Sequence, residues 1–190
     1  IRSISIPASV CELEEKWCFD TPLLTKVTIS AENKYFKNCE ENDQLIVGKS
    51  DFKKDEYDVL IFACRNIETV TIPPYIKYIS SYAFENSKIK TISFPSQVKR
   101  IGEYSFHKCQ NLAKVDFHSD SNLEIIDDYS FSYSSLQTLT IPSTVVQIGS
   151  HTFTECRKFH AVNFMSNSKL LSIEKYAFSY TSIEYISIDV

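Results

Sequence analysis

The stretch Phe94–Phe117, FPSQVKRIGEYSFHKCQNLAKVDF, contains the pattern that determines the fold. A Pro follows an apolar residue, two apolar residues stand three apart at Val98 and Ile101, and a Phe follows five residues later at Phe106. Parts of the same sequence pattern recur in SSYAFENSKIKTISFP (residues 80–95) and in DDYSFSYSSLQTLTIP (residues 127–142). A catalytic motif is needed only once in a chain, so this repetition indicates a repeat architecture.

A six-residue pattern, apolar-x-x-apolar-x-apolar, recurs along the chain. The alternation at its end predicts a short strand with the last two apolar residues facing inward, such as Ile92 and Phe94, and Ser93 facing outward. Eight copies are present, so we expect about eight stacked parallel strands. They are IRSISI, LTKVTI, IETVTI, IKTISF, LAKVDF, LQTLTI, FHAVNF and IEYISI.

The repeat length points to one class of solenoid. The central Phe residues follow one another at spacings of 22, 25, 22 and 25, and Phe62 stands 22 residues before the first of them; they are Phe84, Phe106, Phe131, Phe153 and Phe178. Units of about 20–29 residues that begin with L-x-x-L-x-L are typical of leucine-rich repeats. We therefore predict a β-dominated leucine-rich-repeat solenoid, with short stacked parallel strands on one face and turns or short helical segments on the other.

One segment interrupts the repeats. Between about residues 31 and 61, the apolar runs in NDQLIVGKS and YDVLIFA flank a charged turn, which predicts a β-hairpin insertion. We expect residues 1–190 to form a single array. Both ends of the sequence lie at strand patterns without a polar capping segment, so we expect it to be a fragment of a longer protein.

The half-repeat Pro-x-x-Val-x-x-Ile-x-x-x-(Ala/Ser)-Phe, followed by Phe-x-x-Cys-x-x-Leu in residues 106–112, resembles the BspA-like leucine-rich-repeat family over nearly the whole chain. The resemblance implies a non-enzymatic interaction module, on the cell surface or secreted, in bacteria or some protists. Proteins of this family are often implicated in adhesion, so a protein or glycan partner is expected.

Composition excludes several other functions. The formal charge of −4 argues against a surface for nucleic acid or an anionic membrane, since both need a concentrated positive field. No apolar run is long enough to suggest a membrane span, and no signal or anchor stands in this sequence. The cell-surface or extracellular location is thus an implication of the resemblance alone.

Cysteines and histidines give no chemical site. Cys109 and Cys156 occupy one slot two turns apart, beyond disulfide reach, and are expected to be buried thiols. The sequence leaves open a disulfide bond between Cys11 and Cys18. The four histidines occupy four different slots, so we expect no catalytic residue, metal or cofactor; they are His107, His118, His151 and His160.

Aromatic residues recur at another slot, which His151 shares: Trp17, Tyr82, Tyr104, Tyr129 and Tyr176. Packing between turns is the favoured interpretation, and a platform for stacking sugars is the alternative.

The outward strand positions are mostly Ser and Thr, which form favourable ladders in stacked strands. Departures from this ladder gather toward the C-terminal repeats, so we predict the partner-binding site there, comprising Lys114, Asp116, His118, His160, Asn163, Glu184 and Tyr185.

Two other functions remain open. A parallel β-helix carbohydrate-active enzyme would need paired carboxylates about 5–9.5 Å apart, and Asp116 has no acidic neighbour in its slot. An intracellular scaffold is favoured slightly by the absence of any N-x-S/T sequon.

Overall fold

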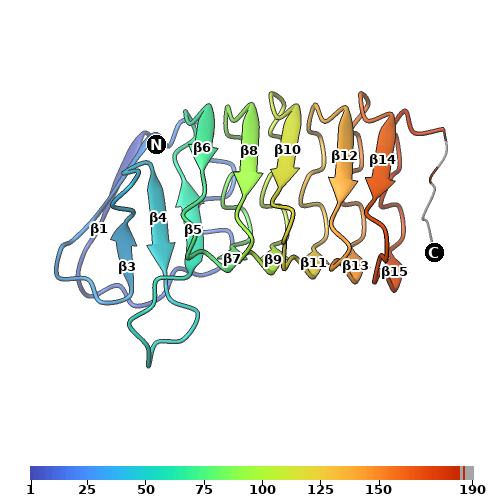
Figure 1. Ribbon diagram of the computed structural model, residues 1–190. Coiled ribbons are helices and arrows are strands. Elements are labelled where there is room, and N and C mark those ends of the chain that lie inside the picture. The colour runs from blue at the N-terminus through green and yellow to red at the C-terminus, as the bar shows by residue number, and fades with distance from the viewer. Residues whose placement is uncertain (185, 187–190) are drawn as a thin grey trace.

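The structure of the chain, a computed structural model, describes residues 1–184 and residue 186. The chain forms a β-solenoid of about 7 turns, and no helix occurs among the described residues (Figure 1). The predicted solenoid with stacked parallel strands is therefore confirmed. Turns and two-residue strands occupy the positions for which turns or short helices were expected.

The six-residue patterns form the strands of one side of the solenoid, which we call the front face. They align without slippage, so that Ile92 of one turn lies beside Val70 and Val115 of its neighbours. This register stacks equivalent apolar residues inward and leaves the residues between them exposed. The front face comprises the sheet of β6 (Thr69–Thr71), β8 (Thr91–Phe94) and β10 (Lys114–Phe117), and the adjoining pair β12 (Thr138–Ile141) and β14 (Ala161–Phe164).

A second sheet, the base sheet, runs along the whole array. In each repeat the segment equivalent to Val98–Ile101 contributes a strand of two residues to this sheet. The last residues of these strands are in register: Ile79, Ile101, Ile126, Ile148 and Ile173. Its eight strands are β3 (Phe36–Asn38), β4 (Leu45–Gly48), β5 (Val59–Ala63), β7 (Tyr78–Ile79), β9 (Arg100–Ile101), β11 (Ile125–Ile126), β13 (Gln147–Ile148) and β15 (Ser172–Ile173).

The third side of each turn is an unusual corner, which we call the aromatic corner. In each turn two residues four apart have positive φ, such as Tyr104 (54°) and Lys108 (57°), and neither is Gly. The N–H groups of alternate corner residues donate to the next turn; Tyr104 and Phe106, for example, bond the carbonyls of Asp128 and Ser130. These bonds between turns hold non-Gly residues in a conformation that they otherwise rarely adopt.

Two aromatic columns run along this corner. The central Phe rings stack inside the solenoid with centroids 4.7–5.7 Å apart. The Tyr82, Tyr104, Tyr129, His151 and Tyr176 rings stack at 4.6–5.0 Å. Because these faces cover one another, packing between turns is confirmed as the role of the column. Trp17 does not belong to it and packs on Phe62 instead, with centroids 5.3 Å apart.

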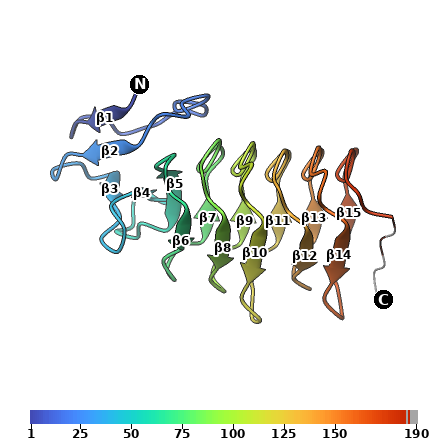
Figure 2. The same ribbon diagram turned by 90° about the horizontal axis from the view of Figure 1, so that it is seen from above.

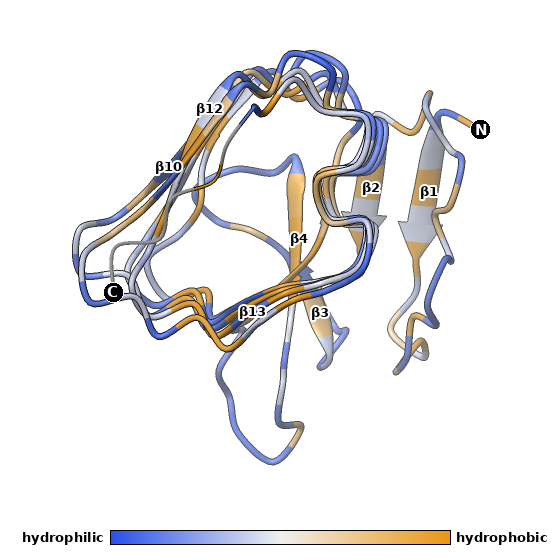
Figure 3. Ribbon diagram, turned by 90° about the vertical axis from the view of Figure 1, so that its right-hand side faces the viewer, coloured by the Kyte–Doolittle hydropathy of each residue, from blue (hydrophilic) through white to orange (hydrophobic). Residues whose placement is uncertain are grey.

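The first two repeats are set apart from the rest. Strands β1 (Ser3–Ile6) and β2 (Lys26–Ile29) pair only with each other. Figures 2 and 3 show this N-terminal pair turned and displaced to the aromatic-corner side of the ring that the other turns form. The expected stack of about eight strands is therefore divided. Its eighth copy, IEYISI, lies partly outside the described residues.

The predicted hairpin is confirmed and divides the interior. Strands β4 and β5 pair antiparallel, and β3 adds a third strand that the sequence did not suggest. Leu45 and Leu60 face the main core of the array, whereas Ile46 and Phe62 face a smaller core under the N-terminal pair. Phe62 therefore does not continue the Phe column, although its spacing suggested that it would.

All six cysteines are free. Cys109 and Cys156 are fully buried, as predicted, and their thiols donate to the carbonyls of Phe84 and Phe131 at 3.0 and 3.1 Å. Burial raises the pKa of each thiol to about 11, so both stay protonated. Cys11 is exposed while Cys18 is buried, and the two are not bridged.

Candidate functional site

The predicted partner-binding residues begin on β10. Lys114 and Asp116 both point outward, and the Lys114 ammonium lies 2.7 Å from an Asp116 carboxylate oxygen. The two side chains are 66% and 47% exposed, so this ion pair contributes little to stability and remains accessible. The register places the pair beside Thr91 and Ser93 of β8.

His118 and His160 lie at the borders of the same face, and Asn163 lies on it. His118 follows β10 and accepts a hydrogen bond from the N–H of Asp120 at its Nδ1 (3.1 Å). His160 precedes β14, and its Nδ1 lies 3.0 Å from the carbonyl oxygen of Lys158. Asn163 is exposed on β14 beside Thr140. The two histidines thus lie beyond opposite ends of their strands, since His118 follows β10 and His160 precedes β14.

The structure brings these residues together only in part. Lys114 and Asp116 lie on β10 with His118 directly after it, while Asn163 lies on β14 with His160 directly before it, and β12 separates the two strands. Glu184 is exposed after the last described turn, and Tyr185 lies outside the described residues. The geometry is that of an open surface rather than of a converging site.

The buried histidine, His107, serves packing. Its Nδ1 lies 2.7 Å from the Ser132 hydroxyl, and its ring meets Tyr104 and Tyr133 edge to face. Burial, with a smaller contribution from Lys108, lowers its pKa to about 4, so it is neutral at pH 7. Over the part of the chain that the structure describes, no group of three or more His, Cys, Asp or Glu side chains could hold a metal ion.

A cleft that sequence reasoning did not identify lies where the hairpin meets the array. We call it the seam cleft; its volume is about 390 Å³. One wall is the loop of residues 49–58, which projects from the solenoid (Figure 1). The opposite wall is formed by the segments that come after β6 and β8 in the sequence. Its lining residues are Lys37, Asp55, Glu56, Tyr57, Asp58, Tyr75, Lys77 and Gln97.

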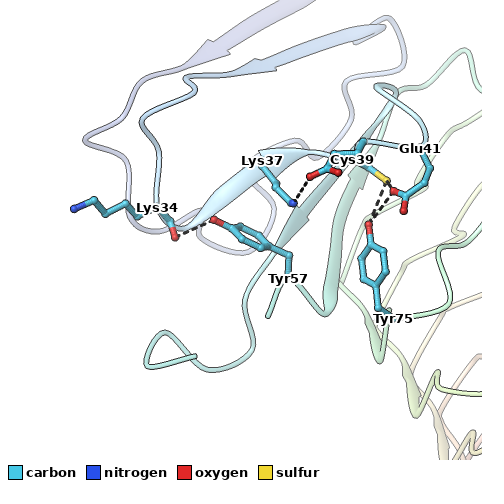
Figure 4. Close-up of polar contacts among 7 residues, drawn as sticks. Lys34, Lys37, Cys39, Glu41, Tyr57 and Tyr75 are labelled. Carbon is cyan, nitrogen blue, oxygen red and sulfur yellow. Dashed lines mark hydrogen bonds and ion pairs between the residues drawn. The ribbon is translucent and has the colours of Figure 1, made fainter. Parts of the chain in front are cut away.

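Two tyrosines in this cleft are held by their hydroxyl groups (Figure 4). Tyr75 donates to a Glu41 carboxylate oxygen (3.1 Å), which also accepts from the Cys39 thiol (3.0 Å). The bond from Cys39 is the main cause of the lowered pKa of Glu41. Tyr57 donates to the Lys34 carbonyl (3.3 Å), and the ammonium groups of Lys37 and Lys49 lie 4.8 and 4.7 Å from its ring centroid.

The charged groups around the seam cleft are paired. The Lys77 ammonium lies 3.0 Å from a carboxylate oxygen of Glu56 and 3.3 Å from one of Asp58. The Lys37 ammonium lies 2.8 Å from a carboxylate oxygen of Glu40. Burial alone would raise the pKa of Asp58, but hydrogen bonds from Ser50 and Lys77 lower it overall. The sequence does indicate the hairpin turn around Phe52 to Tyr57 as a competing binding site, because it carries two aromatic residues in a charged loop. It does not indicate that this loop meets the Pro-Pro-Tyr segment after β6.

The stacked turns, the front strands and the base sheet together define a leucine-rich-repeat solenoid. The chain matches the family described as "BspA type Leucine rich repeat region (6 copies)" over residues 1–88, 41–156 and 77–190, and it belongs to this family. Repeats of this type typically build non-enzymatic scaffolds. No curated protein matches the chain.

Several solved structures share the fold. The pneumococcal vaccine antigen PcpA is 19% identical with a TM-score of 0.57, over 74% of this chain and 41% of that one. A leucine rich cell surface protein from Faecalibacterium prausnitzii is 20% identical with a TM-score of 0.54, over 78% and 48%. A leucine-rich repeat protein from Eubacterium ventriosum is 19% identical with a TM-score of 0.53, over 98% and 60%. The chain thus spans about half the length of these relatives.

Within the described residues, no helix combines the length and apolar character that crossing a membrane requires.

Proposed function

We propose that this chain is an adhesin-like interaction module at a cell surface or in secreted form, and that it binds a protein partner through the front face. The observation that carries the proposal is the β8–β10 register, which holds Lys114 and Asp116 in fixed positions beside the hydroxyl ladder of Thr91 and Ser93. A rigid lattice loses little conformational entropy on docking. The Faecalibacterium relative is a cell surface protein, which supports this location.

The chemistry of the front face favours a polar partner surface. Lys114 provides an exposed cation, Asp116 a half-exposed anion and Asn163 an exposed amide, on strands of one face. Such side chains set the orientation and specificity of a protein interface rather than most of its affinity. His118, His160 and Glu184 extend the proposed site along its borders, and Tyr185 is retained as a residue of the site from the sequence alone.

The test is adhesion by beads coated with the purified chain, on cultured epithelial cells and on a basement-membrane protein extract. Combining Lys114→Glu with Asn163→Ala should weaken attachment at least about tenfold, equivalent to about 1.4 kcal/mol. The melting temperature should change little, because both side chains are exposed.

The matched control is Lys108→Glu, which makes the same charge change on the aromatic corner. Glu155 occupies the equivalent position with φ of 62°, so Glu fits this backbone. Equal loss of attachment for both variants would show a general charge effect and contradict the proposed site. Deleting residues 53–56 of the projecting loop should leave attachment intact.

A further inference from the structure

The seam cleft has the features of a small-ligand site that is separate from the front face. Its volume of about 390 Å³ falls within the range of ligand pockets, about 300–1,000 Å³. Aromatic walls with a few fixed polar groups are the usual composition of such pockets. Here the walls are Tyr57 and Tyr75, which come from segments on opposite sides of the seam.

The two rings are fixed before any ligand arrives. Each hydroxyl is bonded away from the cleft, Tyr75 to Glu41 and Tyr57 to the Lys34 carbonyl, while the ring itself lines the cleft (Figure 4). Tyr75 is 37% exposed, so part of its ring is available. A wall that is already ordered costs little entropy when a ligand docks.

The charge pattern selects among ligand classes. Each ammonium that lines the cleft already lies within 2.8–3.3 Å of a carboxylate. A charged ligand would have to displace one partner of such a pair, which leaves the other partner unpaired. A neutral hydroxyl can instead donate to the carboxylate and accept from the ammonium at the same time. Gln97 adds an amide that can do both.

We propose that the seam cleft binds a neutral sugar residue, with a C–H face of the pyranose against the Tyr75 ring and its hydroxyl groups among Glu56, Lys77 and Gln97. A pyranose combines two apolar faces with a rim of hydroxyls, which is the complement of this cleft. The glycan would lie along the seam between the hairpin and the array, so the chain would carry two different binding surfaces.

The experiment is saturation-transfer NMR of the whole chain with the methyl glycosides of glucose, galactose, mannose and N-acetylglucosamine. At least one should bind with a Kd of about 1 mM, as expected for a single sugar in an open cleft. Tyr75→Ala should weaken binding at least about tenfold, whereas Tyr75→Phe, which keeps the ring, should weaken it less. Gln97→Ala should also weaken binding, and because the Gln97 side chain is exposed, this substitution leaves the packing of the chain unchanged.

The matched control is Tyr133→Ala, since Tyr133 is a similarly exposed tyrosine (43%) on the aromatic corner. It should bind sugars as the unaltered chain does. The proposal is overturned if none of the glycosides binds, or if Tyr133→Ala weakens binding as much as Tyr75→Ala does. It is also overturned if only a sulfated glycan or a lysine-rich peptide binds, because the cleft would then select charge.

Discussion

The inner phenylalanines of the column are packed between two other phenylalanine rings. Phe106 is fully buried between Phe84 and Phe131, with ring centroids 4.7 and 5.1 Å away, and Phe94 meets it edge to face. Truncation to Ala would remove these contacts and leave a cavity that adjacent turns cannot close, since the turns are hydrogen-bonded to one another.

We therefore expect Phe106→Ala to lower the free energy of unfolding by about 3–5 kcal/mol, measured by urea denaturation. Phe52→Ala is the control, because that ring is 62% exposed in the projecting loop. An unchanged urea midpoint for Phe106→Ala would contradict the proposed packing of the column.

His107 makes stability depend on pH. Its pKa is about 4 in the folded chain and about 6.5 when unfolded, because burial and nearby Lys108 disfavour the charged ring. Between these values the unfolded chain binds the extra proton. The neutral buried ring therefore contributes its full stabilisation above about pH 6.5. As the pH falls from 6.5 toward 4, the free energy of unfolding decreases by at most about 3 kcal/mol.

The measurement is urea unfolding at pH 7.0 and at pH 5.0 for the unaltered chain and for His107→Asn, whose amide can still bond Ser132. The variant should lose less stability between these pH values. His151→Asn is the control on the same corner, where the ring is only partly buried. A pH dependence that is identical in the unaltered chain and His107→Asn would show that His107 does not carry the effect.

At the level of the element, the aromatic corner departs from the usual rule that Gly occupies left-handed positions. Lys108 has φ of 57°, and its equivalents are Asn86, Tyr133, Glu155 and Tyr180. The side chains vary because the position points outward, while the hydrogen bonds to the next turn fix the backbone. A β-branched residue is the exception, since its side chain clashes most in this conformation.

We accordingly expect Lys108→Val to destabilise the chain by about 1–2 kcal/mol, within the range for strained backbone. Lys108→Asn should be neutral or slightly stabilising, because Asn tolerates positive φ and already occupies the equivalent position at residue 86. Thermal unfolding of the two variants provides the comparison. Equal melting temperatures for Val and Asn would indicate that the corner relaxes and stores no strain.

The sequence predicted the stacked columns and the hairpin, but not how the hairpin strands are buried or where the seam cleft forms. The Phe and Ile columns follow from periodicity, since equivalent residues in stacked turns must meet. The hairpin followed from two apolar runs. That β4 and β5 are buried on both faces was not predictable, because this depends on the N-terminal pair packing behind them. Neither was the seam cleft, whose residues come from segments that only the fold brings together.

At the level of the whole molecule, the hairpin changes the direction of the array. Ser5 and Thr28 occupy the same outward position of the six-residue pattern as Thr71, yet β1 and β2 lie off the axis of the other turns (Figure 2). A repeat pattern reports the conformation of each turn and says nothing about how an insertion redirects the stack. The continuous front face therefore begins at β6.

The junction between the two parts contains a buried arginine. Arg65 is 1% exposed, and its guanidinium donates to the carbonyls of Ala83 (2.9 Å) and Tyr82 (3.2 Å) in the array and of Cys18 (3.4 Å) in the first repeat. It also lies 4.5 Å from the Phe62 ring centroid. Glu85, likewise buried, accepts a hydrogen bond from the N–H of Asp20. Burial is the main cause of the lowered pKa of Arg65 and of the raised pKa of Glu85.

These contacts predict a local effect of Arg65→Lys. A lysine keeps the charge but cannot reach acceptors in both parts with one planar group, so some of the buried carbonyls lose their donor. Each buried carbonyl that is left without a donor costs about 1–3 kcal/mol. Because the interactions join the N-terminal pair to the array, the loss should appear in opening of the pair and not in the stacked turns beyond it.

Native-state hydrogen exchange can separate the two parts. In Arg65→Lys, the amides of Thr25 and Ser30, which bond Arg2 and Ile6 within the N-terminal pair, should exchange faster by about two to three orders of magnitude. The amide of Gly149, which bonds the Ile126 carbonyl deep in the array, should not change. Arg157→Lys is the matched control, since that side chain is largely exposed beside Glu155. Equal acceleration at Thr25 and Gly149 would mean that the chain opens as one cooperative unit, and Arg65 would then stabilise the whole solenoid rather than its junction.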